Sequence, residues 1–168
     1  MRNIVLIGFM GTGKTSVGHV LAATLGMTFV DMDAIIEERA ARPITDIFAT
    51  DGEPYFRTVE RALVKELAAR DGLVIGTGGG VVLDPDNISD FSATGLVICL
   101  QATPETILDR VMHDTTRPLL AGDDKMKKIL GILEKRRHLY AALPLQVDTN
   151  GLSVEEVAGK ICDLYREN

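Results

Sequence analysis

A glycine-rich loop near the N-terminus constrains the fold more than any other feature of this sequence. Residues 8–15 read Gly-Phe-Met-Gly-Thr-Gly-Lys-Thr and satisfy the pattern G-x-x-x-x-G-K-[ST] at every fixed position. A short apolar run precedes the loop, and a stretch with helical character follows it. In a strand–loop–helix unit of this kind, backbone N–H groups turn toward phosphate oxygens and the helix adds the positive end of its dipole. The loop therefore predicts a binding site for the phosphates of a nucleotide.

Two alternative interpretations of this loop are weaker. A glycine-rich turn used only for tight packing is one, and the flanking strand and helix argue against it. A dinucleotide-binding loop is the other, because Asp31 stands 20 residues beyond Gly11, near the spacing of a ribose-binding acid. That pattern needs glycine where the chain has Ser16, and it leaves Lys14 without a role. We therefore predict that Lys14 reaches the β and γ phosphates and that Thr15 offers its hydroxyl to Mg²⁺.

The alternation of short apolar runs with longer amphipathic stretches predicts the α/β class, with a parallel sheet covered by helices on both faces. A chain of 168 residues without repeats or a linker should form one domain over residues 1–168. Right-handed crossovers would bring the loops after the first three strands together at one edge of the sheet. The candidate strands are residues 4–7, 28–30, 73–75, 96–100 and 145–147.

Several helix boundaries can be read from capping residues. Asp84 and Thr103 each precede a proline at a first helical position, and Ser153 with Glu156 has the spacing of a capping box. Gly26 suits the C-terminal cap of the first helix. These signals predict helices beginning after residues 84, 103 and 153.

Charge and composition exclude several classes of protein. The net charge of −6 argues against nucleic-acid binding, and no apolar run approaches the length of a membrane span. We therefore expect a cytoplasmic protein with no nucleic-acid or membrane partner, and size alone favours a monomer. Cys99 and Cys162 lie in apolar surroundings without metal-ligand spacing, so both are predicted to be small buried hydrophobes.

Two carboxylates follow the second predicted strand. The chain reads Asp31-Met32-Asp33 there, which in extended backbone directs both carboxylates to the same side. One can help to hold Mg²⁺, and the other can orient an acceptor hydroxyl and take its proton. Asp33 could instead cap the helix that begins at this point.

A second charged group lies in the helical region predicted to bind the acceptor, at about residues 33–61. Glu60 follows Arg57 by three residues, so its carboxylate could hold the guanidinium in place. Arg136 offers a second guanidinium, and two such groups suit the planar carboxylate of a small acid. An arginine on a helix can equally be solvated. The apolar residues that could wall the pocket are Ile44, Phe48 and Phe56.

Two loops complete the predicted site. Residues 76–80 read Gly-Thr-Gly-Gly-Gly, more glycine than a turn needs, which favours close approach of the backbone to a ligand, with a flexible hinge as the alternative. Residues 113–124 form a candidate lid that would exclude water and could bring Arg117 onto the phosphates. A plain surface loop is the alternative for that segment.

In this order, the motifs resemble those of the shikimate kinase family over essentially the whole chain. They are residues 8–15, 31–33, 56–60, 78–80, 117–120 (Arg-Pro-Leu-Leu) and 147–149 (Val-Asp-Thr). The resemblance implies a fold of the nucleoside-monophosphate-kinase type, a P-loop sheet with strand order 2-3-1-4-5. It also implies transfer of the γ-phosphate of ATP to the 3-hydroxyl of shikimate, a step in the chorismate route to aromatic amino acids.

The resemblance also implies roles for single residues. Asp33 would meet the hydroxyls of shikimate as the base, and Arg57 with Arg136 would bind its carboxylate. Arg136 rather than the adjacent Arg137 fits the family spacing to Tyr140. The glycines expected to contact shikimate are Gly78, Gly79 and Gly80.

On the nucleotide side, the resemblance implies that Arg110 stacks near adenine and that Arg117 acts on the phosphates as a catalytic residue beside Lys14. Asp31 would support Mg²⁺ together with Thr15. The loop residues expected to bind ATP are Gly11, Thr12, Gly13, Lys14, Thr15 and Ser16. The alternatives left open are a kinase for another small hydroxy acid such as gluconate and a non-catalytic ATP-binding regulator.

Overall fold

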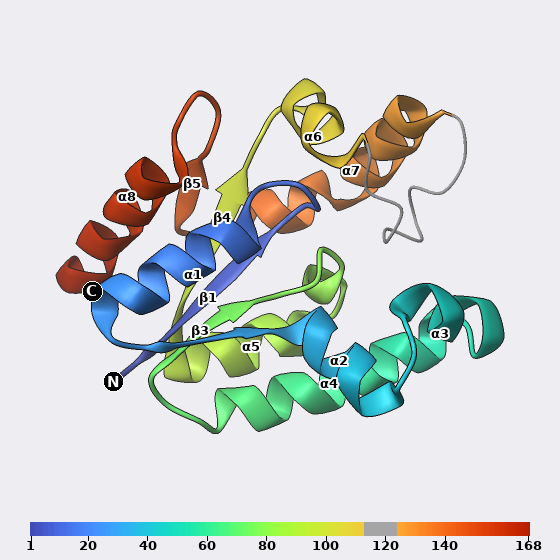
Figure 1. Ribbon diagram of the computed structural model, residues 1–168, viewed down its shortest axis with the longest axis horizontal. Coiled ribbons are helices and arrows are strands. Elements are labelled where there is room, and N and C mark those ends of the chain that lie inside the picture. Colours follow the sequence, from blue (N-terminus) through green and yellow to red (C-terminus); the bar gives the residue numbers. More distant parts are fainter. Residues whose placement is uncertain (113–123) are drawn as a thin grey trace.

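The computed structural model describes residues 1–112 and 124–168, and at its centre lies a five-stranded parallel sheet in the order β2-β3-β1-β4-β5 (Figure 1). The predicted class, strand number and strand order are confirmed, and every predicted strand lies within a residue of an observed one. The strands are β1 (Asn3–Gly8), β2 (Thr28–Asp31), β3 (Leu73–Gly76), β4 (Gly95–Gln101) and β5 (Gln146–Asp148).

Helices connect the strands. They are α1 (Lys14–Leu25), α2 (Met32–Ala40), α3 (Ile44–Thr50), α4 (Glu53–Ala68), α5 (Pro85–Thr94), α6 (Pro104–Val111), α7 (Lys125–Ala141) and α8 (Val154–Glu167), with a 3₁₀ turn η1 (Val81–Leu83). The region predicted to bind the acceptor contains α2, α3 and the first half of α4. The predicted lid lies outside the described residues, apart from Asp124.

The sheet separates two apolar layers, and the side chains of β1 show why. Ile4 and Leu6 belong to the cluster formed with α1 and α8, whereas Val5 and Ile7 belong to the cluster formed with α4, α5 and α7. The two groups of helices lie on opposite faces of the sheet (Figure 1). Side chains alternate between the faces of a strand, so a strand at the centre of a covered sheet is buried on both faces and is largely apolar. All six residues of β1 are accordingly buried, while β2 and β5 at the edges are more exposed.

The predicted helix starts are confirmed. Asp84 accepts the N–H of Asp86, Thr103 accepts that of Thr106, and Ser153 forms a capping box with Glu156. Gly26 ends α1 with a φ of 65°, in the left-handed region that glycine adopts cheaply.

One detail of the second strand differs from the prediction. The chain turns into α2 at Met32, so Asp33 lies in the first turn of a helix and not in extended backbone. Asp31 is the N-cap, and its carboxylate accepts the N–H of Ala34 at 3.1 Å. The capping role considered for Asp33 is therefore wrong. A cap must precede the first helical turn, and Asp33 is already inside it.

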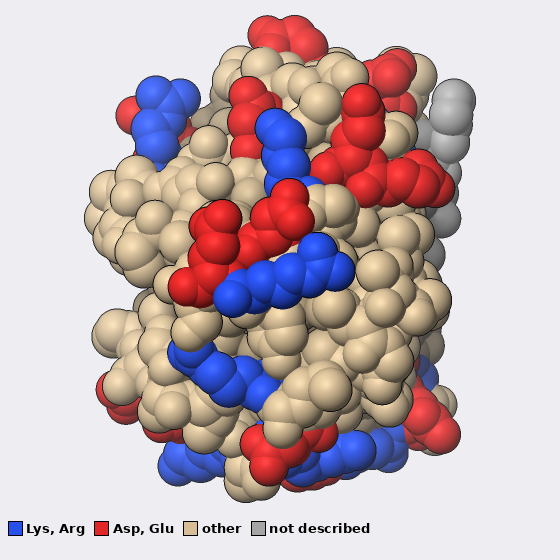
Figure 2. Space-filling view, turned by 90° about the vertical axis from the view of Figure 1, so that its left-hand side faces the viewer, with Lys and Arg blue, Asp and Glu red and all other residues tan. Residues whose placement is uncertain are grey.

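Charges of both signs are mixed on the face that bears α8 and the two chain ends (Figure 2). On α8, Arg166 forms an ion pair with Asp163 at 3.5 Å. The net charge of −6 is therefore not gathered into one acidic field on this face. No helix within residues 1–112 or 124–168 has the length and apolar character needed to cross a membrane.

Candidate active site

The phosphate loop joins β1 to α1 and is closed by the side chain of Lys14. The Lys14 ammonium donates to the carbonyl oxygens of Gly8 at 2.7 Å and Phe9 at 2.9 Å, and only 9% of the residue is exposed. Gly11 and Gly13 adopt φ values of 77° and 95°, which side chains disfavour. The loop is thus folded around the lysine, and its backbone requires glycine at both of these positions.

A cavity of about 450 Å³ opens in front of this loop and gathers residues from both predicted halves of the site. Its volume lies within the range typical of small-ligand sites. It collects the carboxyl ends of β1, β2 and β3, as expected for a parallel sheet of this topology. The lining residues are Gly11, Gly13, Lys14, Thr15, Ser16, Asp31, Asp33, Ala34, Glu37, Ile44, Gly76, Thr77 and Arg110.

Two oxygen ligands suitable for Mg²⁺ meet in this cavity. The hydroxyl of Thr15 donates to Oδ2 of Asp31 at 3.3 Å. Mg²⁺ prefers oxygen ligands and is usually held by one or two protein groups together with substrate phosphates, so this pair fits the ion. The parts of the chain that the structure describes contain no cluster of three or more histidine, cysteine or acidic side chains able to hold a metal by themselves.

Arg110 connects α6 to the phosphate loop. Its Nη1 donates to the carbonyl of Gly11 at 2.9 Å and to the hydroxyl of Thr149 at 3.4 Å. Thr149 is buried and in turn donates to the carbonyl of Gln101 at 2.7 Å. The turn after β5 is thereby tied to the rim of the cavity where Arg110 lies.

The glycine run after β3 lies against three charged side chains. A Cβ added to Gly78 would stand 3.0 Å from Oδ1 of Asp33, and one added to Gly80 would stand 2.3 Å from Nη2 of Arg57. At Gly79 the added atom would lie 3.7 Å from Nη1 of Arg136. The close approach of these side chains explains why Gly78 and Gly80 are glycines, because Asp33 and Arg57 occupy the space that a Cβ would need. The groups that the run approaches here are side chains of the protein, and the predicted approach of its backbone to a ligand stays a prediction.

Arg57 is held between two glutamates, as predicted for one of them. Its Nη1 donates to Glu60 at 2.9 Å and its Nη2 donates to Glu53 at 3.0 Å. Burial opposes the charge of Arg57, but the two carboxylates outweigh it and raise the pKa of the guanidinium. The buried Nε of Arg57 has no hydrogen-bond partner among the described residues. One N–H donor of the Arg57 guanidinium is therefore left for a ligand.

Glu60 is the buried member of this group, with 1% of the residue exposed. Burial raises the pKa of its carboxyl, and the nearby charge of Asp33 raises it further, although Arg57 and Arg136 act in the opposite direction. A Cβ on Gly78 would stand 3.2 Å from Oε2 of Glu60, so this carboxylate borders the same glycine as Asp33. The glycine run is thus bordered by two carboxylates, at Gly78, and by two guanidinium groups, at Gly79 and Gly80.

The structure distinguishes Arg136 from Arg137. Arg136 is 5% exposed, and its buried Nη1 has no hydrogen-bond partner within the described chain. The side chain of Arg137 is 69% exposed and its carboxylate neighbour, Glu134, is 3.8 Å away. Burying a charged donor without a partner is costly. Arg136 is therefore the arginine that fits a role in binding a ligand.

The predicted apolar wall forms beside Arg57. The rings of Phe48 and Phe56 lie 5.1 Å apart, and the guanidinium of Arg57 stands 5.2 Å from the centroid of the Phe56 ring. Ile44 lines the cavity itself. The Phe56 ring of this pair therefore lies near the guanidinium of Arg57, which also contacts the glycine run at Gly80.

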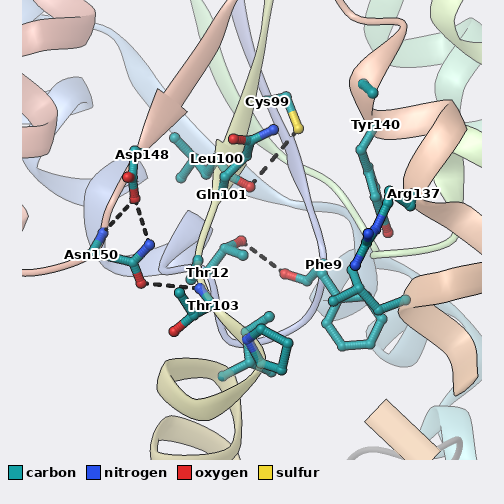
Figure 3. Close-up of a pocket in the computed structure, with 15 residues that line it drawn as sticks. Phe9, Thr12, Cys99, Leu100, Gln101, Thr103, Arg137, Tyr140, Asp148 and Asn150 are labelled. Carbon is teal, nitrogen blue, oxygen red and sulfur yellow. Dashed lines mark hydrogen bonds between the residues drawn. The ribbon is translucent and has the colours of Figure 1, made fainter. Parts of the chain in front are cut away.

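A second cavity, of about 310 Å³, borders the same loop and is shown in Figure 3. Phe9 and Thr12 line it, whereas Gly11 and Gly13 to Ser16 line the first. The Thr12 hydroxyl donates to the carbonyl of Phe9 at 2.8 Å, so of Thr12 only the backbone remains for phosphate. Cys99 also lines this second cavity, and burial raises the pKa of its thiol to about 11, in agreement with the predicted inert role.

Some functional contacts were not predicted. Glu53 had no assigned role although it stands four residues before Arg57, a spacing that could have indicated it. Glu37 lines the cavity and accepts the N–H of Ile44 at 2.8 Å, a contact between helices that no local pattern signals. Tyr140 donates to the carbonyl of Gly79, from a segment distant in the sequence. Arg117 lies outside the described residues.

Comparison with known proteins agrees with this geometry. The family model described as shikimate kinase matches residues 10–166. A shikimate kinase of Thermodesulfovibrio yellowstonii is 44% identical over 98% of this chain and 95% of its own length. Another, from Pelotomaculum thermopropionicum, is 43% identical over 100% of this chain and 98% of its own.

Solved structures give the same result. The shikimate kinase of Acinetobacter baumannii in complex with shikimate superposes with a TM-score of 0.95, at 37% identity, covering 100% of this chain and 94% of that one. A gluconokinase from Sinorhizobium meliloti covers 99% of this chain and 97% of its own with a TM-score of 0.58 at 20% identity, which supports the fold alone. The motifs, the shared cavity and the relatives agree, and the chain belongs to the shikimate kinase family.

Proposed function

We propose that this member of the shikimate kinase family transfers the γ-phosphate of ATP to the 3-hydroxyl of shikimate in the cavity of about 450 Å³ between the phosphate loop and the glycine run. The observation that carries the proposal is a pair of buried donors at the glycine run, the first two residues of which, Gly76 and Thr77, line that cavity. Nε of Arg57 and Nη1 of Arg136 have no partner among the described residues, and a small carboxylate would satisfy both. Shikimate has such a carboxylate as well as hydroxyl groups.

For the nucleotide, we propose that the backbone amides of the loop and the ammonium of Lys14 bind the phosphates. Lys14 would exchange its bonds to the carbonyls of Gly8 and Phe9 for phosphate oxygens. Thr15 and Asp31 would hold Mg²⁺, which when bound neutralises part of the negative charge on the β and γ phosphates. Arg110 would lie beside the adenosine part of ATP at the rim of the cavity.

Asp33 is the proposed base. Its carboxylate lines the cavity that holds Lys14 and borders Gly78, so it can accept a hydrogen bond from an acceptor hydroxyl. As the hydroxyl oxygen forms its bond to the γ-phosphorus, the bond from that phosphorus to the β,γ-bridging oxygen breaks and ADP leaves. The proton of the hydroxyl passes to Asp33. The contribution of such a group is typically about 10²- to 10⁴-fold.

Arg57 and Arg136 are proposed to bind the carboxylate of shikimate and thereby fix which hydroxyl faces the γ-phosphate. Arg57 is preorganised by Glu53 and Glu60, so little of its side-chain entropy remains to be lost on binding. Gly78, Gly79 and Gly80 supply the space next to these groups. This arrangement selects for a hydroxylated acid and gives a neutral polyol no partner for the two arginines.

The lid, the cellular compartment and the oligomeric state are proposed from the sequence alone. Arg117 in the lid at residues 113–124 is proposed to act on the phosphates. The cytoplasm, where ATP is available, is the proposed compartment, and a monomer is the proposed state. Gluconate remains the rival acceptor that an assay must exclude, because the fold is shared with a gluconokinase.

The test is a coupled assay of ADP release with purified protein, ATP, Mg²⁺ and a panel of acceptors. ADP release should depend on shikimate and fall to background without it. ³¹P NMR of the product should show one new monoester, at the 3-position. Equal or faster turnover with gluconate or a nucleoside monophosphate would overturn the proposed substrate, and absence of any acceptor-dependent turnover would favour the regulator.

A further inference from the structure

The glycine run after β3 is tied to the rest of the protein at three points. At its start, the Thr77 hydroxyl and N–H both donate to the carbonyl of Leu6, at 2.9 and 3.2 Å. Beyond its end, the amide of Asn87 donates to the carbonyl of Val81 at 2.9 Å. Between them, the Tyr140 hydroxyl donates to the carbonyl of Gly79 at 2.6 Å. The carbonyls of Gly78 and Gly80 accept backbone N–H groups of the following turn, from Val81 at 3.2 Å and Leu83 at 3.0 Å. The carbonyl of Gly79 between them is held by the Tyr140 hydroxyl.

Tyr140 reaches Gly79 from α7, the helix that also carries Arg136. The two residues are four positions apart, so they project from the same face of the helix. Each is 5% exposed. Arg136 places its Nη1 3.7 Å from where a Cβ of Gly79 would be. One helix face thus holds the carbonyl of Gly79 with a hydroxyl and passes a guanidinium over the same residue.

The ring of Tyr140 has a separate contact. It lines the second cavity together with Phe9, and Figure 3 shows it entering from α7 beside Arg137. The ring can therefore serve packing while the hydroxyl serves the glycine run. A substitution that removes only the hydroxyl separates these two contributions.

We propose that Tyr140 is a positioning residue for the acceptor substrate, whose hydroxyl fixes the carbonyl of Gly79 and with it the distance between the glycine run and Arg136. The proposal rests on the proposed role of Arg136 in binding the carboxylate of shikimate. Without the hydroxyl bond, Gly79 can shift relative to Nη1 of Arg136, and the carboxylate meets donors that are less well aligned. Burial raises the pKa of Tyr140 to about 12, so the hydroxyl remains a donor at any pH at which the enzyme would be assayed.

The test compares Tyr140→Phe with a matched control elsewhere in the chain. Tyr165 on α8 also donates its hydroxyl to a backbone carbonyl, that of Arg2, at 3.0 Å. Tyr165→Phe therefore removes the same kind of bond away from the site. In Tyr140→Phe, KM for shikimate should rise about 3- to 10-fold, the effect of one net hydrogen bond, and KM for ATP should stay within about twofold. In Tyr165→Phe, both KM values should match the wild type.

Coupling to Arg136 gives a second measurement, because a role confined to packing of the Tyr140 ring would leave the two losses independent. If Tyr140 acts through Arg136, the losses in kcat/KM for shikimate in Tyr140→Phe and Arg136→Lys should combine to less than their product in the double variant. Additive effects would contradict the proposal. So would an unchanged KM for shikimate in Tyr140→Phe, or equal rises in both KM values. If one of these results is found while the wild-type protein turns over shikimate, this inference alone is overturned. If the wild-type protein is inactive toward shikimate, the proposed function and this inference are overturned together.

Discussion

Gly80 lies directly against the guanidinium of Arg57, so closely that a Cβ added to the glycine would stand 2.3 Å from Nη2 and 2.5 Å from Nη1. The φ of Gly80 is −92°, which any residue can adopt. The glycine is therefore required by space and not by backbone conformation. The arginine and the glycine run must be treated as one packed unit.

Gly80→Ala should displace Arg57 and weaken binding of shikimate. We expect KM for shikimate to rise about tenfold or more, with KM for ATP nearly unchanged, because the three atoms that the added Cβ would meet first all belong to the guanidinium of Arg57. Gly159→Ala on α8 is the matched control, since an added Cβ there meets nothing within 4 Å. Alanine in a helix interior should stabilise that variant by about 0.5–1 kcal/mol without changing either KM. Steady-state kinetics and thermal melts check both, and a normal KM in Gly80→Ala would show that Arg57 does not need its observed position.

Arg136→Lys and Arg137→Lys test which of two adjacent arginines meets the acceptor. Lysine keeps the charge but loses the planar fork. We expect KM for shikimate to rise about tenfold or more in Arg136→Lys, where the parent side chain is buried. The exposed Arg137 should tolerate the same change with little effect. The reverse pattern would assign the carboxylate to Arg137.

Asp33→Asn should reduce turnover and spare nucleotide binding. The amide keeps the size of the side chain but cannot take a proton, so kcat should fall by about 10²-fold or more. The dissociation constant for ATP with Mg²⁺, measured by calorimetry, should stay within about threefold of the wild-type value. Turnover at the wild-type rate would remove Asp33 from the role of base.

Glu60→Gln tests the buried carboxyl through the pH dependence of stability. Because the folded pKa of Glu60 is raised above 4.5, the folded state binds that proton more tightly than the unfolded chain does. This stabilising contribution is complete below the unfolded pKa and is lost as pH rises through the folded one. Glutamine has no such proton. The Tm of the variant minus that of the wild type should therefore become more positive from about pH 4 to about pH 8.

Glu66→Gln is the control, because the pKa of Glu66 is shifted in the opposite direction from that of Glu60. The hydrogen bond from Arg39 lowers the pKa of Glu66, which is exposed. The corresponding Tm difference should change little and in the negative direction as pH rises. A flat or falling difference for Glu60→Gln would contradict the inference that burial dominates at this position.

Local patterns predicted the parts of this protein that depend on neighbouring residues. The phosphate loop, the helix caps at Asp84, Thr103 and Ser153, and the contact between Arg57 and Glu60 all follow from spacings of a few positions. The five strands followed from short apolar runs, which a covered parallel sheet demands. Their order rested on the family resemblance, and the structure confirms it.

Contacts between distant segments could not be predicted in the same way. The packing of Gly80 on Arg57 and the bond from Tyr140 to Gly79 depend on how α4 and α7 lie against the turn after β3. The choice of Arg136 over Arg137 followed the family spacing and stays a prediction, which the burial of Arg136 supports. Asp31 proved to be the cap of α2 because the helix begins at Met32, two residues before the start that a cap at Asp33 would give.

The most direct test of the central claim is a crystal structure of the protein with ADP, Mg²⁺ and shikimate. The account predicts the carboxylate of shikimate at about 3 Å from Nη1 of Arg136 and from the guanidinium of Arg57, with the 3-hydroxyl at a similar distance from Asp33. Shikimate bound with its carboxylate away from both arginines, or bound outside the cavity that holds Lys14 and Asp33, would contradict it.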